Sequence, residues 1–167
     1  FRNVRYIELS TGGGDDEVSV FGELLPMLLR ITVDAGAGDD VVEGARIGGG
    51  VGSFSTVALV VHGGEGTDRF FSGSRSDRFD GGDGFDTVDY SRAPAAVTAR
   101  LSEFRTVTNR DGTTTIVVVD GRATKDGYGS RDTLLWVEEL IGSAFADKLT
   151  GGSLDDVIRG GGGNDKI

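Results

Sequence analysis

The sequence predicts an all-β protein whose chain coils through short strands. A glycine- and aspartate-rich loop recurs at nine-residue spacing, and each copy carries an apolar residue two positions after its aspartate. An apolar residue between two outward neighbours is what a short strand with one buried face requires. In addition, Asp111-Gly112 lies between two runs of β-branched residues, which is a strong signal for a β-hairpin.

The loop reads Gly-Gly-x-Gly-x-Asp-x-apolar-x in its clearest copies, at residues 63–71, 81–89 and 160–167. Degenerate copies lie at 72–80, 142–150 and 151–159, and two looser ones at 11–19 and 35–43. Hydrophobic residues make up 37% of the chain and fall in register with the loops, which argues against a disordered glycine-rich linker.

With this repeat the chain resembles the RTX, or haemolysin-type calcium-binding, family, whose nonapeptide forms a calcium-binding parallel β-helix. The resemblance implies an all-β fold, a right-handed parallel β-roll or β-helix solenoid with an inserted β-hairpin. It also implies several bound Ca²⁺ ions and an extracellular location, secreted or at the cell surface, reached by type I secretion. The chain would then be a fragment of a larger bacterial protein, with further domains on its flanks.

Each part of the nonapeptide has a chemical reason. Glycine tolerates positive φ and leaves carbonyl oxygens uncovered, so that an ion can approach the main chain. Ca²⁺ takes about six to eight oxygen ligands and accepts both carboxylates and carbonyls. The aspartate at position six supplies a short carboxylate, and the apolar residue at position eight points inward. Six residues therefore form a turn and three a strand, and two nonapeptides complete one coil.

This geometry predicts that each loop stacks on the next but one along the chain. The loop of Asp68 should stack on that of Asp86, and the loop of Asp147 on that of Asp165, with Ca²⁺ between them. Asp77 would lie on the opposite edge in a weaker or vacant site, and Asp156 would face a partner beyond Ile167. The metal-site residues expected on these grounds are Asp16, Asp40, Gly63, Glu65, Thr67, Asp68, Asp77, Gly81, Gly82, Asp83, Asp86, Gly142, Ala144, Asp147, Asp156, Gly160, Gly161, Gly162 and Asp165.

We expect one continuous domain in four stretches. Residues 1–61 would form irregular coils with degenerate loops, because the loops of Asp16 and Asp40 are 24 residues apart rather than 18. Residues 62–89 would form the regular calcium-binding roll. Residues 90–141 would leave the repeat, and residues 142–167 would return to calcium-binding repeats.

Strands are expected at several places outside the clear repeats. Alternating or β-branched runs predict them at residues 4–9, 30–34, 54–61 and 96–101. The hairpin would pair 105–108 with 113–119 and would either project from the solenoid or cap its core. The apolar run 21–29, broken by Pro26, would form a loop or plug the core, and 48–52 a flexible loop.

Composition narrows the possible partners. The 27 acidic residues, of which 19 are Asp, give a formal net charge of −10, so nucleic acid and anionic membranes are poor partners. The chain has no cysteine, and no stretch approaches the roughly 20 apolar residues of a membrane span. Repulsion between clustered carboxylates would favour a metal-dependent fold, because metal binding energy then becomes folding energy.

No catalytic site is expected in this stretch. His62 is the only histidine, and no Gly-x-Ser-x-Gly elbow accompanies it. His-Glu-x-x-His and Walker motifs are absent as well. The parent would be either a secreted enzyme that carries this block as an appendage, or an adhesin or surface-layer protein in which the block is structural.

A polysaccharide-binding or polysaccharide-acting appendage is the alternative. Arg69, Arg75, Arg78 and Arg92 gather around the regular roll, and outward arginines can pair with the carboxylates of an acidic glycan. Charge balance beside the many aspartates is the simpler explanation for these arginines.

Overall fold

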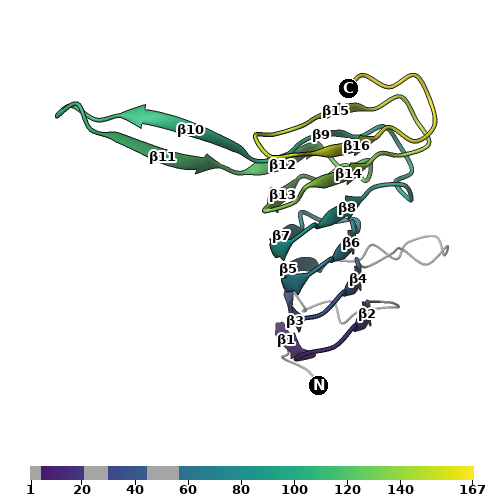
Figure 1. Ribbon diagram of the computed structural model, residues 1–167. Helices are drawn as coiled ribbons and strands as arrows, with labels where there is room; N and C mark the ends of the chain where they lie inside the picture. Colours follow the sequence, from purple (N-terminus) through teal and green to yellow (C-terminus); the bar gives the residue numbers. More distant parts are fainter. Residues whose placement is uncertain (1–4, 21–29, 45–56) are drawn as a thin grey trace.

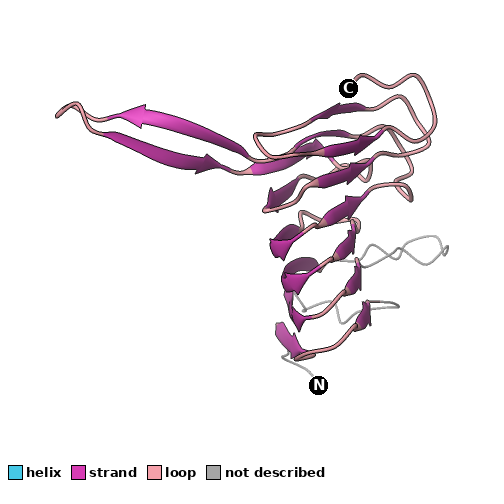
Figure 2. Cartoon of the chain, viewed as in Figure 1, coloured by secondary structure: helices cyan, strands magenta, loops and turns pink. Residues whose placement is uncertain are grey.

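The computed structural model describes residues 5–20, 30–44 and 57–167. Within these residues the chain forms strands and loops and no helix (Figure 2). The strands lie in two main sheets that face each other across the core, and the chain passes from one sheet to the other in successive coils (Figure 1).

The larger sheet has eight strands. In spatial order they are β1 (Tyr6–Ser10), β3 (Arg30–Ala37), β5 (Ala58–Gly66), β7 (Arg78–Gly84), β13 (Asp132–Leu135), β12 (Gly121–Lys125), β9 (Thr98–Arg100) and β15 (Lys148–Thr150). The smaller sheet has six, in the order β16 (Val157–Arg159), β14 (Glu139–Ile141), β8 (Thr87–Asp89), β6 (Arg69–Phe71), β4 (Val41–Glu43) and β2 (Glu17–Ser19). Every pairing in these two sheets is parallel except those of β12, which confirms the predicted all-β parallel solenoid.

The core is built from the apolar residue at position eight of each repeat. Val42, Phe70, Phe79 and Val88 are completely buried between the sheets. The rings of Phe70 and Phe79 stack with centroids 5.6 Å apart and thereby join the two sheets. The nine-residue phase therefore places one inward side chain in each short strand, as the sequence predicts.

The turns between the sheets lie at two edges of the solenoid. We call first edge the turns that lead from the larger to the smaller sheet, at residues 11–16, 36–40, 64–68, 82–86, 136–138 and 151–156. The second edge holds the turns that lead back, of which the structure describes 72–77, 90–97, 142–147 and 160–165, and also the connection 126–131 between β12 and β13.

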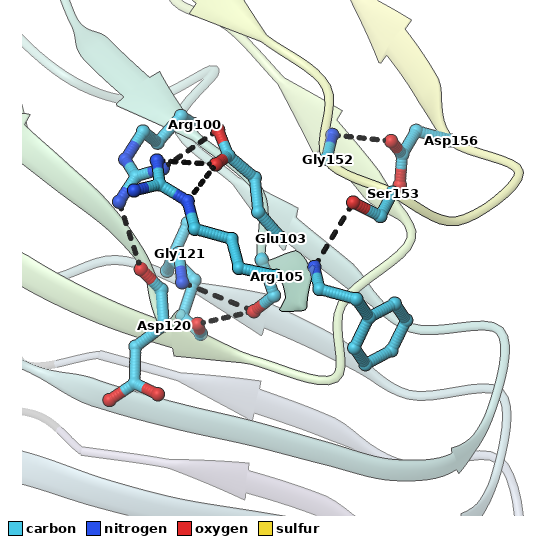
Figure 3. Close-up of polar contacts among 11 residues, drawn as sticks. Arg100, Glu103, Arg105, Asp120, Gly121, Gly152, Ser153 and Asp156 are labelled. Carbon is cyan, nitrogen blue, oxygen red and sulfur yellow. Dashed lines mark hydrogen bonds and ion pairs between the residues drawn. The ribbon is translucent and has the colours of Figure 1, made fainter. Parts of the chain in front are cut away.

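The predicted hairpin forms and projects away from the stacked coils (Figure 1). It consists of β10 (Glu103–Thr108) and β11 (Thr114–Val119), paired antiparallel around a turn in which Gly112 has φ +83°. At its base, Glu103 accepts from both Arg100 and Arg105, and the amide of Phe104 donates to Ser153 Oγ at 3.0 Å (Figure 3).

The sequence does not predict β12, which follows the hairpin and enters the larger sheet antiparallel between β13 and β9. Its only buried side chain is the small Ala123, so it carries no strong apolar signal. This strand is the one departure from parallel pairing in the two main sheets of the described residues.

Some expectations meet the structure only in part. The boundary between residues 61 and 62 falls inside β5, and β13 and β14 belong to the two main sheets although they lie within 90–141. The run 21–29, the loop 48–52 and residues 54–56 lie outside the described residues. Among the described residues there is no helix long and apolar enough to cross a membrane.

Candidate metal centre

A ladder of carboxylates runs along the first edge. The amide of Asp16 donates to Asp40 Oδ1 at 2.8 Å, that of Asp40 to Asp68 Oδ1 at 2.9 Å, and that of Asp68 to Asp86 Oδ1 at 2.9 Å. The amide of Asp86 continues the series by donating to Glu138 Oε2 at 2.9 Å. Each coil thus holds the carboxylate of the next one in place.

The second oxygen of each aspartate in this ladder has no partner. The Oδ2 atoms of Asp16, Asp40, Asp68 and Asp86 are buried and accept no hydrogen bond. Leaving a buried polar group unpaired costs about 1–3 kcal/mol, and more when the group is charged. Four such atoms in one row therefore indicate that a cation belongs beside them.

Main-chain carbonyls converge on the same places. A Cβ added at Gly63 would collide with Asp68 Oδ2 and, at 2.5 Å, with the carbonyl oxygen of Gly81 in the next coil. A Cβ at Gly81 would collide with Asp86 Oδ2 and the carbonyl oxygen of Trp136. Gly63 and Gly81, at position one of their loops, thus each leave a space in which a carboxylate oxygen and a carbonyl oxygen from two coils meet.

This donor set fits Ca²⁺, which readily combines single carboxylates with carbonyls. In the described part of the chain, no three Asp, Glu, His or Cys side chains gather around a single point, so carbonyls must provide part of any coordination shell. The residues present are therefore those of a loop-type site, not of a side-chain cage.

Glycine conformation keeps these loops open. In the loop of Asp68, Gly64 and Gly66 have φ of +117° and +132°, a region that residues with a Cβ rarely adopt. The loops of Asp16, Asp40, Asp86 and Asp165 likewise have positive-φ glycines at positions two and four: Gly12, Gly14, Gly36, Gly38, Gly82, Gly84, Gly161 and Gly163. We call these five the open loops.

In three other loops, the second carboxylate oxygen of the aspartate accepts a hydrogen bond from an amide of the same loop. Asp77 Oδ2 accepts from the amide of Gly73 at 3.0 Å, Asp147 Oδ2 from that of Ser143 at 2.5 Å, and Asp156 Oδ2 from that of Gly152 at 2.5 Å. We call these the closed loops. In each, position four holds a residue other than glycine (Arg75, Phe145 or Leu154), and none of these adopts positive φ.

The predicted stacking of alternate loops is confirmed for both pairs. Gly64 and Gly82 are register partners in β5 and β7, and Asp86 accepts from the amide of Asp68. At the second edge, Asp165 Oδ1 accepts from the amide of Asp147 at 3.0 Å. Asp77 lies at the second edge, opposite the ladder, as expected.

The upstream loops are more regular than their spacing suggests. The loops of Asp16 and Asp40 stack directly, and that of Asp40 stacks on that of Asp68 although the two aspartates are 28 residues apart. Extra residues between the loops therefore do not disturb the first edge.

The remaining predicted residues surround these loops. Glu65 and Asp83 are exposed register partners, and the amide of Thr67 donates to Asp39 Oδ1 at 2.8 Å. Near the end of the chain, Gly162 packs over Ala144, and Gly160 lies beside Asp165 Oδ2. The loop of Asp156 contacts the chain that enters the hairpin, where its Ser153 amide donates to the carbonyl of Ser102 at 3.1 Å.

Sequence reasoning missed Glu138 and Trp136. Trp136 has φ +49° and closes the first-edge turn between β13 and β14 without a glycine loop. The available signal was the repeat's acid-x-apolar spacing, because buried Leu140 follows Glu138 by two positions. The same spacing links Asp132 with buried Leu134 at the second edge.

Burial changes the protonation of the ladder. It raises the pKa of Asp86 to about 7, with a further contribution from the neighbouring carboxylates Asp68 and Glu138. Burial likewise raises the pKa values of Asp68 and Asp40 above the ordinary value of 3.8. Without a cation, these groups therefore take up a proton at a higher pH than an exposed aspartate does.

Arg69 and Arg92, two of the arginines around the roll, form ion pairs with acidic side chains. Arg69 forms an ion pair with buried Asp89. Arg92 pairs with Glu43 at 2.7 Å and lies over the ring of Phe71. His62 is exposed within β5, with its Nδ1 atom 3.8 Å from Asp80 Oδ2.

Stacked glycine–aspartate loops on a parallel two-sheet solenoid, with free carboxylate oxygens at one edge, define a calcium-binding β-roll. Comparison with protein families identifies the RTX calcium-binding nonapeptide repeat in four copies, over residues 32–46, 60–92 and 138–167. The chain therefore carries RTX, or haemolysin-type calcium-binding, repeats, which bind several Ca²⁺ ions and are typical of proteins that leave the cell by type I secretion. No curated protein matches the chain.

Proposed function

We propose that this chain is a folding module that becomes ordered when it binds Ca²⁺ after export and then stabilises a larger extracellular bacterial protein. The observation that carries the proposal is the row of four buried, unpartnered Oδ2 atoms along the first edge. Metal-free, these carboxylates are desolvated and repel one another. A bound cation removes both penalties, so its binding energy becomes folding energy.

The position of the ladder supports a stabilising role. It joins five successive coils, so ions bound along it would stabilise the long axis of the solenoid rather than one local loop. The chain has no cysteine, so calcium would take the place that disulfides have in many secreted loop-rich proteins.

We further propose that this stretch is not itself catalytic and that an activity, if the parent has one, resides elsewhere in that protein. The alternative of acidic polysaccharide binding through Arg69 and Arg92 is weakened by their pairing with Asp89 and Glu43. Flanking domains and extracellular location are part of the proposal and rest on the repeat family.

The experiment is a Ca²⁺ titration followed by far-UV circular dichroism, with Mg²⁺ and metal-depleted protein as controls. We expect Ca²⁺, but not Mg²⁺, to increase the β-structure and the thermal stability of a marginally stable metal-depleted protein, because Mg²⁺ demands a tighter octahedral shell. A β-spectrum that does not respond to Ca²⁺ addition or removal would contradict the proposal.

A further inference from the structure

The second edge contains a buried acidic site, two of whose carboxylates, Asp126 and Asp132, lie outside the matched repeats. Asp77, Asp126 and Asp132 are each at most 3% exposed, and no lysine or arginine among the described residues forms an ion pair with any of them. Asp77 belongs to a closed loop, whereas Asp126 and Asp132 come from the segment that returns from the projecting hairpin.

Two of these three carboxylates are fully hydrogen-bonded. Asp77 accepts from the amides of Leu59 and Gly73. Asp132 accepts from the amide of Asp77 at one oxygen, and from Ser72 Oγ and Tyr90 Oη at the other, each at 3.0 Å. Neither leaves an oxygen without a donor.

Asp126 is different. Its Oδ1 accepts from the amides of Tyr128 and Ser130, both at 2.8 Å, and so shapes the loop between β12 and β13. Its Oδ2 is buried with no partner, although the residue is completely inaccessible to solvent. An ionised carboxylate in that position needs a positive charge beside it.

A second unpartnered oxygen lies on the facing loop. Ser74 Oγ is buried and makes no hydrogen bond. Ser130 connects the two segments, because its Oγ donates to the Ser74 carbonyl at 3.3 Å while its amide donates to Asp126 Oδ1. The orphaned oxygens therefore belong to two segments, 52 residues apart in sequence, that are bonded to each other.

We propose that Asp126 Oδ2 and Ser74 Oγ hold a divalent cation, Ca²⁺ in this setting, that binds the returning segment to the second edge. Main-chain carbonyls of the two loops would supply the remaining oxygens, as in the open loops of the first edge. A cavity of about 550 Å³, whose lining includes Gly127, Gly129 and Ser130 together with Lys125 and Arg131, opens beside this loop. The choice of Ca²⁺ rests on the proposed function, but the site uses none of the first-edge residues.

The test compares Asp126→Asn with Asp120→Asn by counting bound Ca²⁺ through native mass spectrometry and calorimetric titration of the full chain. The asparagine at 126 keeps an acceptor for Tyr128 and Ser130 but removes the free anionic oxygen. Asp120 is exposed, and within the described part of the chain only its backbone carbonyl accepts a hydrogen bond, so its substitution reproduces the change in charge alone. We expect the variant at 126 to bind one ion fewer, or one ion at least tenfold more weakly, and the variant at 120 to match wild type.

A role that is only structural would give a different result. Loss of packing would destabilise Asp126→Asn equally in Ca²⁺ and in metal-depleted buffer, whereas the proposal expects a loss in Ca²⁺ only. Ser74→Ala removes the proposed ligand on the other loop, and we expect it to weaken the binding of the same ion as well. Unchanged ion number and affinity in both variants would overturn the proposal. If wild type itself bound no Ca²⁺, the proposed function would fail as well.

Discussion

The open and closed loops of this solenoid solve the same problem in different ways. Both place an aspartate at position six of the loop. In the open loops of the first edge, one carboxylate oxygen stays free beside a carbonyl of the next coil. In the closed loops, the amide four residues earlier donates to that oxygen. A buried carboxylate can thus be compensated by a cation or by the chain itself, and the residue at position four decides which.

We expect the largest effect from replacing a glycine at position four of an open loop. Gly84 has φ +153° and its added Cβ would collide with the carbonyl of Gly66, so Gly84→Ala should prevent the loops of Asp68 and Asp86 from stacking. We expect loss of Ca²⁺-dependent folding in circular dichroism, or a midpoint at least tenfold higher in Ca²⁺. Gly13→Ala is the control, because its Cβ would meet only the Ala37 carbonyl at 3.6 Å. Equal titrations for the two variants would refute the assignment.

Substituting one aspartate in a closed loop and one in an open loop tests whether the two kinds of loop stabilise the fold differently. Asp147→Ala leaves the buried amides of Val97 and Ser143 without an acceptor, and we expect a loss of about 2–4 kcal/mol in unfolding free energy with or without Ca²⁺. Asp86→Asn keeps the acceptor for Asp68 and removes the free oxygen, so it should weaken Ca²⁺ binding while leaving metal-depleted protein as stable as wild type. Denaturant unfolding in both buffers separates the two patterns, and the same response from both variants would mean that open and closed loops do not differ.

Protons should compete with calcium at the first edge. Burial raises the pKa of Asp86 to about 7, so the folded state retains a proton that the unfolded state releases near 3.8. Stability of metal-depleted protein from this group is therefore present below about pH 4 and lost as the pH rises through about 7. Ca²⁺ affinity should rise over the same window, because the ion requires the ionised form. Thermal melts of metal-depleted protein and Ca²⁺ titrations at pH 5 and 7.5 check both signs, and a metal-free stability that increases with pH would contradict them.

The smallest effect is expected on the exposed face of the hairpin. Ile116 is 72% exposed, so Ile116→Thr should change the unfolding free energy by no more than about 0.5 kcal/mol. Val88→Thr, which puts a hydroxyl at a fully buried position eight, should cost about 1–3 kcal/mol. Melts in saturating Ca²⁺ measure both, and a large loss at Ile116 would show that the hairpin packs against the body.

Local patterns made much of this fold predictable. The nine-residue phase fixes which side chains enter the core, and the Asp-Gly pair with its β-branched flanks fixes the hairpin. The motif set the loop of Asp77 apart as a weaker or vacant site, but it did not separate Asp147 and Asp156 from the open loops, although Phe145 and Leu154 at position four carried the information. The role of Glu138 was hidden because a long side chain replaces aspartate after a three-residue turn at Trp136. Strand β12 was missed because Ala123 is too small to signal burial.

The antiparallel β12 has a consequence for the path of the solenoid axis. In the larger sheet, β12 and β9 separate β13 from β15, whereas in the smaller sheet β14 pairs directly with β16. At about 4.8 Å between neighbouring strands, one face of the last coil advances roughly 10 Å further than the other. The final coil is therefore a wedge. Blocks of this kind joined end to end would trace an arc and not a straight rod, with the larger sheet on its outer side.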